Sequence, residues 1–269
     1  MQNEKKRETV PFQSRYKREY GTIKEYSDHN FKVTHLRCVK QAGIDSGKSF
    51  FTAKGEAGND GKLSNSISRT RAKIFEYAMC NPWEYFVTLT LNPDKYNRHD
   101  LGKFNTDLSQ AIRNYNKKHK VNVRYLLIPE RHKDGAWHMH GFIMGLPVEK
   151  LTEFRKRDKL PRKILNRINE GKRVFTWDMY SERFGFADIE QIENHEAASK
   201  YITKYITEDI KQSVTELNAH LYYCSKGLKG ATVVHTGTLA RMLPTPDFQN
   251  DYCEIKYYPT LEGAKECFV

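Results

Sequence analysis

The middle of the chain alternates apolar and polar residues in patterns that predict strands and helices. Tyr85–Leu91 alternates apolar residues with threonine and is followed by Asn-Pro, which is typical of a strand with one buried face. From Leu101 to Tyr115 apolar residues recur every three or four positions, which indicates an amphipathic helix. Two more strands, Val123–Glu130 and Trp137–Met144, flank a Lys-Asp-Gly turn. We expect these two strands to form a hairpin.

The elements on either side of this hairpin complete a prediction of the fold class. Helical spacing predicts a helix over Ser68–Cys80, and alternation predicts a strand over Phe184–Ile192. Asn194 is expected to cap a helix that continues to Asp209. The order strand, helix, hairpin, strand, helix indicates an α+β fold, with a central antiparallel β-sheet and flanking helices.

The two ends of the chain are less regular than its middle. Residues up to about Lys24 are charged and weakly patterned, and Gly43–Ser68 is rich in glycine and serine. We therefore expect a loosely ordered N-terminal accessory region (1–70), a core domain (71–215), and a C-terminal extension packed on or beside it (216–269).

The composition excludes several classes of protein. Hydrophobic residues make up 38% of the 269 residues, which excludes wholesale disorder. A mean hydropathy of -0.76 and the absence of a long apolar run exclude a membrane protein. The charged start is unlike a secretion signal, and the five widely spaced cysteines include no Cys-x-x-Cys pair. We expect a soluble protein of the bacterial cytoplasm with reduced thiols.

The charge of the chain favours a polyanionic partner such as DNA or RNA. The formal net charge is +12, which is a mild indication and no proof. Residues 151–173 contain nine basic residues against three acidic ones, so this segment is either a solvated face or a surface that binds phosphates. Its candidate DNA-binding residues are Arg155, Arg157, Lys159, Arg162 and Lys163.

The clearest candidate for chemistry is the triplet His138-Met139-His140. Because alternate residues of a strand point to the same face, both imidazoles can bind one metal ion, although a His-x-His pair also occurs by accident. Glu130 supplies a third ligand if residues 133–135 form a three-residue loop, because it then lies opposite His138. A two-residue Asp-Gly loop would place Glu130 opposite Met139, on the other face. The metal hypothesis therefore depends on the register of the hairpin.

Two tyrosines, Tyr201 and Tyr205, lie four residues apart in a predicted helix and hence on one face of it. They are either ordinary core packing or a pair of nucleophiles that serve one site. Because tyrosine is a weak nucleophile at its usual pKa of about 10, it would need help from a metal ion and from a neighbouring cation such as Lys204.

Three motifs in this order carry a resemblance to a known family. Phe86–Thr90, Trp137–Phe142 and Tyr201–Tyr205 resemble the three motifs of HUH endonucleases, specifically of the rolling-circle replication initiators of bacterial plasmids and phages. The region they span, Trp83–Asp209, is about half of the chain. The resemblance implies a split β-α-β, ferredoxin-like catalytic domain that nicks and rejoins single-stranded DNA.

The resemblance also implies roles for individual residues. The two histidines and Glu130 would bind Mg²⁺ or Mn²⁺, and Tyr201 would attack the scissile phosphate to give a 5′-phosphotyrosine and a free 3′-hydroxyl primer. Tyr205 would be the second nucleophile of two-tyrosine members, but Glu208 stands where that pattern often repeats a lysine, so its role stays open. The implied partners are single-stranded origin DNA and a host helicase and polymerase.

Other interpretations stay open. A transposase of the HUH class shares the motif order, a relaxase typically places its tyrosine before the histidines, and a non-catalytic nucleic-acid-binding protein would need only the basic segment. The phosphate-loop-like pattern at 42–49 continues into glycine-rich sequence instead of a helix, so we do not expect ATP binding. Leu221–Lys229 combines aromatic and basic residues that either stack on single-stranded DNA or, more simply, pack in the core.

Overall fold

The fold is α+β, as the sequence predicts, and contains two antiparallel sheets. A computed structural model describes residues 16–27, 30–40, 60–202, 221–240, 242–250 and 253–269. Contacts within the chain divide it into two compact units. The larger unit is Thr52–Gly230, and the smaller one combines Met1–Phe51 with Ala231–Val269. None of the helices within the described ranges has the length and apolar character needed to cross a membrane.

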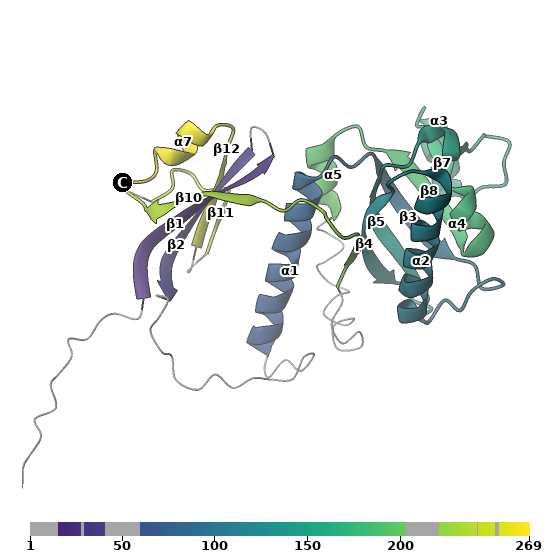
Figure 1. Ribbon diagram of the computed structural model, residues 1–269, viewed down its shortest axis with the longest axis horizontal. Helices are drawn as coiled ribbons and strands as arrows, with labels where there is room; N and C mark the ends of the chain where they lie inside the picture. The colour runs from purple at the N-terminus through teal and green to yellow at the C-terminus, as the bar shows by residue number, and fades with distance from the viewer. Residues whose placement is uncertain (1–15, 28–29, 41–59, 203–220, 241, 251–252) are drawn as a thin grey trace, which may run out of the picture. The chain divides into compact units, whose positions relative to one another are not determined.

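The larger unit is built around one antiparallel sheet (Figure 1). Its seven described strands follow the order β6-β7-β8-β3-β5-β4-β9, so the predicted hairpin lies beside the central strand β3. The strands are β3 (Tyr85–Leu91), β4 (Arg124–Arg131), β5 (Trp137–Met144), β6 (Thr152–Glu153), β7 (Val174–Thr176), β8 (Gly185–Gln191) and β9 (Tyr223–Cys224).

Helices cover both faces of this sheet, as the alternation along β3 requires. Five α-helices and one short 3₁₀ helix are described in this unit. They are α1 (Asp60–Cys80), α2 (Leu101–His119), η1 (Val148–Lys150), α3 (Arg162–Asn169), α4 (Asp178–Arg183) and α5 (His195–Ile202). The Asp100 carboxylate begins α2 by accepting the backbone N–H of Lys103 at 2.9 Å, which satisfies one of the free donors of its first turn.

Two separate hydrophobic cores form on the two faces of the sheet. On one face, Leu89 and Met139 belong to a buried cluster with Phe104 of α2. On the other face, Phe142 of β5 clusters with Ile74 of α1. Alternate residues of β5 therefore serve different cores, so that His138 and His140, on either side of Met139, cannot face α2.

The smaller unit joins strands from opposite ends of the chain. Its five described strands are ordered β10-β1-β2-β12-β11, and they form a sheet whose inner face packs Ile23 and Val33 against Leu239 and Cys267. The elements are β1 (Tyr16–Ser27), β2 (Asn30–Lys40), β10 (Thr232–Thr238), β11 (Phe248–Gln249), β12 (Cys253–Tyr258) and helix α7 (Leu261–Lys265).

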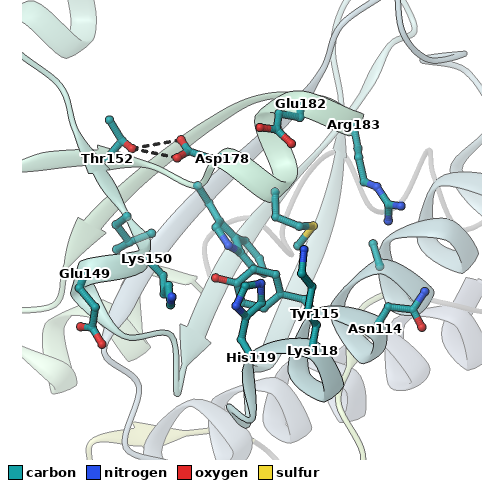
Figure 2. A pocket seen from close by; sticks show the side chains of 14 residues that line it. Asn114, Tyr115, Lys118, His119, Glu149, Lys150, Thr152, Asp178, Glu182 and Arg183 are labelled. Carbon is teal, nitrogen blue, oxygen red and sulfur yellow. Dashed lines mark hydrogen bonds between the residues drawn. The ribbon is translucent and has the colours of Figure 1, made fainter.

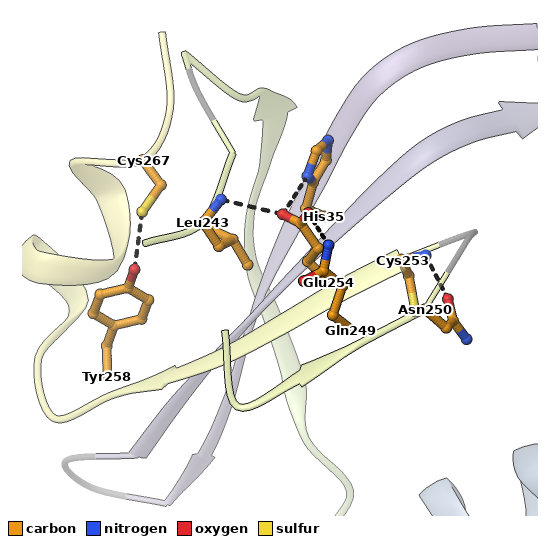
Figure 3. A network of polar contacts seen from close by, with 8 residues as sticks. All are labelled: His35, Leu243, Gln249, Asn250, Cys253, Glu254, Tyr258 and Cys267. Atoms are coloured by element: carbon orange, nitrogen blue, oxygen red, sulfur yellow. Dashed lines mark hydrogen bonds and ion pairs between the residues drawn. The ribbon is translucent and has the colours of Figure 1, made fainter. Parts of the chain in front are cut away.

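A buried polar pair links β2 to β12 in this unit (Figure 3). His35 Nδ1 lies 3.2 Å from an oxygen of Glu254, and each side chain is only 1% exposed. The same carboxylate accepts the backbone N–H of Leu243 at 3.2 Å and the side-chain amide of Gln249 at 3.3 Å. Because a buried carboxylate without such partners would be strongly destabilising, this network fixes how the C-terminal segment packs on β2.

Several predicted element boundaries need correction. The charged residues from Tyr16 to Lys24 were expected to be loosely ordered, but they form most of β1 because β2 and β10 pair with them on both sides. Helix α1 begins at Asp60 and not at Ser68. The phosphate-loop-like pattern at 42–49 lies outside the described residues.

The units also cut across the predicted three-part division. Strands of the expected accessory region (1–70) pair with strands of the expected extension (216–269), and sequence reasoning missed this pairing because it joins distant segments. The boundaries after residues 70 and 215 stay predictions. Tyr222 and Cys224 pack partly buried against the core that contains Phe142, in line with the simpler interpretation of that segment.

Candidate metal centre

The β4–β5 hairpin has the register that a three-ligand site needs. Glu130 lies directly opposite His138, and Ile128 lies opposite His140. The backbone N–H of His132 donates to the carbonyl of Ala136 at 2.8 Å, which closes a three-residue loop over residues 133–135. Gly135 ends this loop with a φ of +82°, a backbone conformation that glycine adopts without strain. The three-residue loop required by the sequence argument is therefore present.

Glu130, His138 and His140 converge on one point. One carboxylate oxygen of Glu130 lies 2.9 Å from Nε2 of His138 and 2.7 Å from Nε2 of His140. One potential ligand atom from each residue lies within 4.8 Å of the others. Two imidazoles and a carboxylate make a donor set that fits a divalent cation, although these residues alone do not say which one. The three predicted ligands are thus brought together as a candidate metal site.

The histidines keep the carboxylate ionised. Hydrogen bonds from His138 and His140 hold the pKa of Glu130 well below its usual value, because they outweigh the effect of burial, which would raise it. A carboxylate in this state offers only acceptor lone pairs. The site is therefore ready to receive a cation without first losing a proton from Glu130.

Two neighbours of the triad were missed by the sequence argument. His132 follows Glu130 by two residues on β4, and its ring lies edge-on to that of His138 with centroids 3.9 Å apart. Thr88 of β3 lies opposite His140, and its hydroxyl is 3.0 Å from Nδ1 of that imidazole. Both positions have the same strand parity as the ligands, which was the signal that could have identified them.

Tyr201 lies on the same side of the sheet as the triad. It belongs to α5, whose Ile202 is buried in the core beneath α1, while the Tyr201 side chain is 44% exposed. The ring of Phe86 is 5.6 Å from that of Tyr201 and 6.4 Å from that of His140, measured between centroids. Phe86 therefore connects the predicted nucleophile to the predicted metal site. The other two predicted catalytic residues, Lys204 and Tyr205, lie outside the described residues.

The basic segment is anchored to the same face of the sheet. Phe154 stacks on Phe186 of β8 at 5.4 Å, and Phe186 lies opposite Thr90, whose other neighbour is His138. No contact between this segment and the triad is found among the described residues. Five of its side chains are exposed, as a phosphate-binding role would need: Arg155, Arg157, Lys159, Arg162 and Lys163.

Not every basic residue of the segment is available to a ligand. Arg167 of α3 pairs with Asp188 at 2.5 Å and also with Glu190, both on β8. Arg173 pairs with Glu153 at 2.7 Å. Because Asp188 lies opposite Thr88, the pairing with Arg167 places α3 on the face of the sheet that carries the triad.

Two hollows in the larger unit differ in their relation to the triad. One, of about 450 Å³, lies between α2, η1 and α4 and is lined by Tyr115, Lys150 and Trp177 among others (Figure 2). Trp177 belongs to the core cluster of Met139, so this cavity opens on the face away from the imidazoles. The other, of about 510 Å³, is lined by residues that include Thr90 and His132 and therefore adjoins the triad.

The central part of the chain has a recognisable family relationship. Residues 84–210 match the family model of the replication-associated protein ORF2. This segment contains the whole hairpin, the three candidate ligands and Tyr201. No curated protein and no solved structure matches the chain. The match to this replication-associated family is consistent with a role in starting replication.

Proposed function

We propose that this chain is a rolling-circle replication initiator of the HUH class, which nicks and rejoins one strand of origin DNA. The observation that carries the proposal is the convergence of Glu130, His138 and His140 on the sheet face that also bears Tyr201, within the segment that matches the replication-associated family. An accidental His-x-His pair gives no reason for a carboxylate in register on the neighbouring strand.

The proposed metal is Mg²⁺ or Mn²⁺, held by the triad, and when bound it would polarise the scissile phosphate. Tyr201 Oη attacks the phosphorus, so that a phosphotyrosine bond forms while the bond from phosphorus to the 3′ oxygen breaks. The phenolic proton is given up and the departing 3′ oxygen gains one, which leaves a free 3′-hydroxyl. Because one phosphodiester replaces another, the reverse attack by a 3′-hydroxyl rejoins the strand without a nucleotide cofactor.

The residues around the triad have supporting roles in this proposal. The Phe86 ring holds Tyr201 near His140, and the exposed cations of the basic segment bind backbone phosphates of single-stranded DNA. Lys204 would favour the tyrosinate, and Tyr205 would act as a second nucleophile. A host helicase and polymerase would then use the nicked strand.

The test is to incubate the full chain with Mn²⁺ and a randomised pool of single-stranded oligonucleotides, and to identify adducts by mass spectrometry. We expect a 5′-phosphotyrosine on Tyr201 that is lost in Tyr201→Phe and kept in Tyr115→Phe, which changes a tyrosine on the opposite face. Changing both His138 and His140 to alanine should abolish the adduct and retain salt-sensitive DNA binding. DNA binding without any adduct in the unaltered chain would instead favour a non-catalytic nucleic-acid-binding protein.

A further inference from the structure

The two ring nitrogens of His140 have different partners. Nε2 faces the carboxylate of Glu130 at 2.7 Å, and Nδ1 faces the hydroxyl of Thr88 at 3.0 Å. Thr88 lies directly opposite His140 in the β3–β5 ladder, and its hydroxyl is held in place by the backbone of the central strand. The imidazole is therefore bound from both sides, once by a candidate co-ligand and once by a residue outside the ligand set.

This arrangement bears on which nitrogen carries the proton. A neutral imidazole has one N–H, and the nitrogen without it can bind a metal ion. If Nδ1 donates its hydrogen to the Thr88 hydroxyl oxygen, the lone pair of Nε2 points toward Glu130 and the cation. Partners of this kind orient the ring of a metal-binding histidine and select the tautomer that binds.

The other histidine of the triad lacks such a partner, although a threonine stands at the matching position. Thr90 lies opposite His138 just as Thr88 lies opposite His140. Even so, Nδ1 of His138 is buried and has no hydrogen-bond partner among the described residues. Its ring is instead packed edge-on against His132. The two threonines thus form a natural comparison, since they share a strand, a face and a neighbouring imidazole and differ in the hydrogen bond.

We propose that Thr88 is a positioning residue of the metal centre, which fixes the tautomer and orientation of His140 through its hydroxyl. The inference rests on the proposed function, because it assumes that the triad binds a cation. It adds that the ligand set is not sufficient: the central strand contributes a hydroxyl without which His140 binds the metal poorly.

The first experiment measures Mn²⁺ binding to the full chain without DNA, by titration with detection of free Mn²⁺ by electron paramagnetic resonance. Thr88→Val keeps the β-branched shape and removes the hydroxyl, so we expect binding to weaken by about 10-fold or more. Thr88→Ser should restore most of the affinity, and Thr90→Val should bind like the unaltered chain. Circular dichroism of the metal-free variants establishes that they are folded; Thr88→Ala serves if Thr88→Val does not fold.

The outcomes separate this inference from the proposed function. Equal Mn²⁺ affinity in Thr88→Val and the unaltered chain, or an equal loss in Thr90→Val, would overturn the role of Thr88 alone. No Mn²⁺ binding by the unaltered chain would overturn the metal site itself. Nitrogen-15 NMR of the Mg²⁺-loaded chain gives an independent readout. We expect the proton of His140 on Nδ1, and a proton on Nε2 would contradict the inference.

Discussion

The carboxylate of Glu130 meets the imidazole of His138 at 2.9 Å because the two residues are directly opposed in the β4–β5 ladder. This opposition depends on the number of residues in the loop, since a slip of one residue turns every side chain of one strand to the other face relative to its partner. The metal centre is therefore specified as much by the length of a surface loop as by its ligands.

Deletion of Lys133 should destroy the metal centre without changing any ligand. The remaining Asp-Gly pair favours a two-residue turn, which would move Glu130 to the face of Met139. We expect Mn²⁺ binding to be lost in the deletion variant and retained in Lys133→Ala, as measured by titration of the folded proteins. Retained binding in the deletion variant would mean that the strands keep their register by packing alone.

Gly135→Ala should destabilise the protein by about 1–2 kcal/mol, because its φ of +82° is unfavourable for a residue with a Cβ. Gly102→Ala is the matched control. Gly102 lies inside α2, and a Cβ there meets only the Asp100 carboxylate at 3.7 Å. That substitution should leave stability unchanged or raise it by about 0.5–1 kcal/mol. Urea unfolding of both variants measures the difference, and equal effects would contradict the strain at Gly135.

Arg167→Met should destabilise the larger unit by about 3 kcal/mol, because it leaves the carboxylates of Asp188 and Glu190 without their cation in a largely buried setting. Arg173→Met removes an arginine of the same segment whose pair with Glu153 is exposed, so we expect little change in stability. Thermal unfolding compares the two variants. A similar result for both would show that Arg167 does not anchor α3.

Phe86→Ala should slow formation of the tyrosine adduct more than it weakens Mn²⁺ binding. The ring packs against both Tyr201 and His140, so its loss removes the contact that holds the nucleophile near the metal. Phe86→Leu keeps much of the packing volume and should lie between the two. Single-turnover cleavage at saturating Mn²⁺ measures the rate, and an unchanged rate in Phe86→Ala would exclude this positioning role.

The stability of the metal-free protein should depend on pH through Glu130. Its pKa in the folded state lies below the usual value of 4.5, so between these two pKa values the unfolded state binds more protons. The stabilisation is fully present above the usual pKa and is lost as the pH falls through the folded one. Between about pH 6 and about pH 3, the unaltered chain should therefore lose stability relative to Glu130→Gln in urea unfolding. A constant difference would contradict the shift.

Local patterns predicted the larger unit well. The parity of Glu130 and His138 could be read from a short loop, because a hairpin joins neighbouring segments and its turn chemistry is local. Thr88 could not be assigned in the same way, since its role depends on which strand becomes the neighbour of β5. The pairing of Arg167 with Asp188 likewise joins separate elements, and the basic run concealed it by suggesting phosphates as the partner.

The smaller unit escaped prediction for a similar reason, and its connectivity has a consequence for synthesis. The strands β1 and β2 emerge from the ribosome before the whole of Thr52–Gly230, and their partners β10 and β12 emerge after it. The larger unit can therefore fold first, while the β1–β2 ribbon waits with both edges unpaired. Any nascent chain that stalls before Thr232 presents those open edges to other proteins, so the last strands act as the safeguard against aggregation for the first.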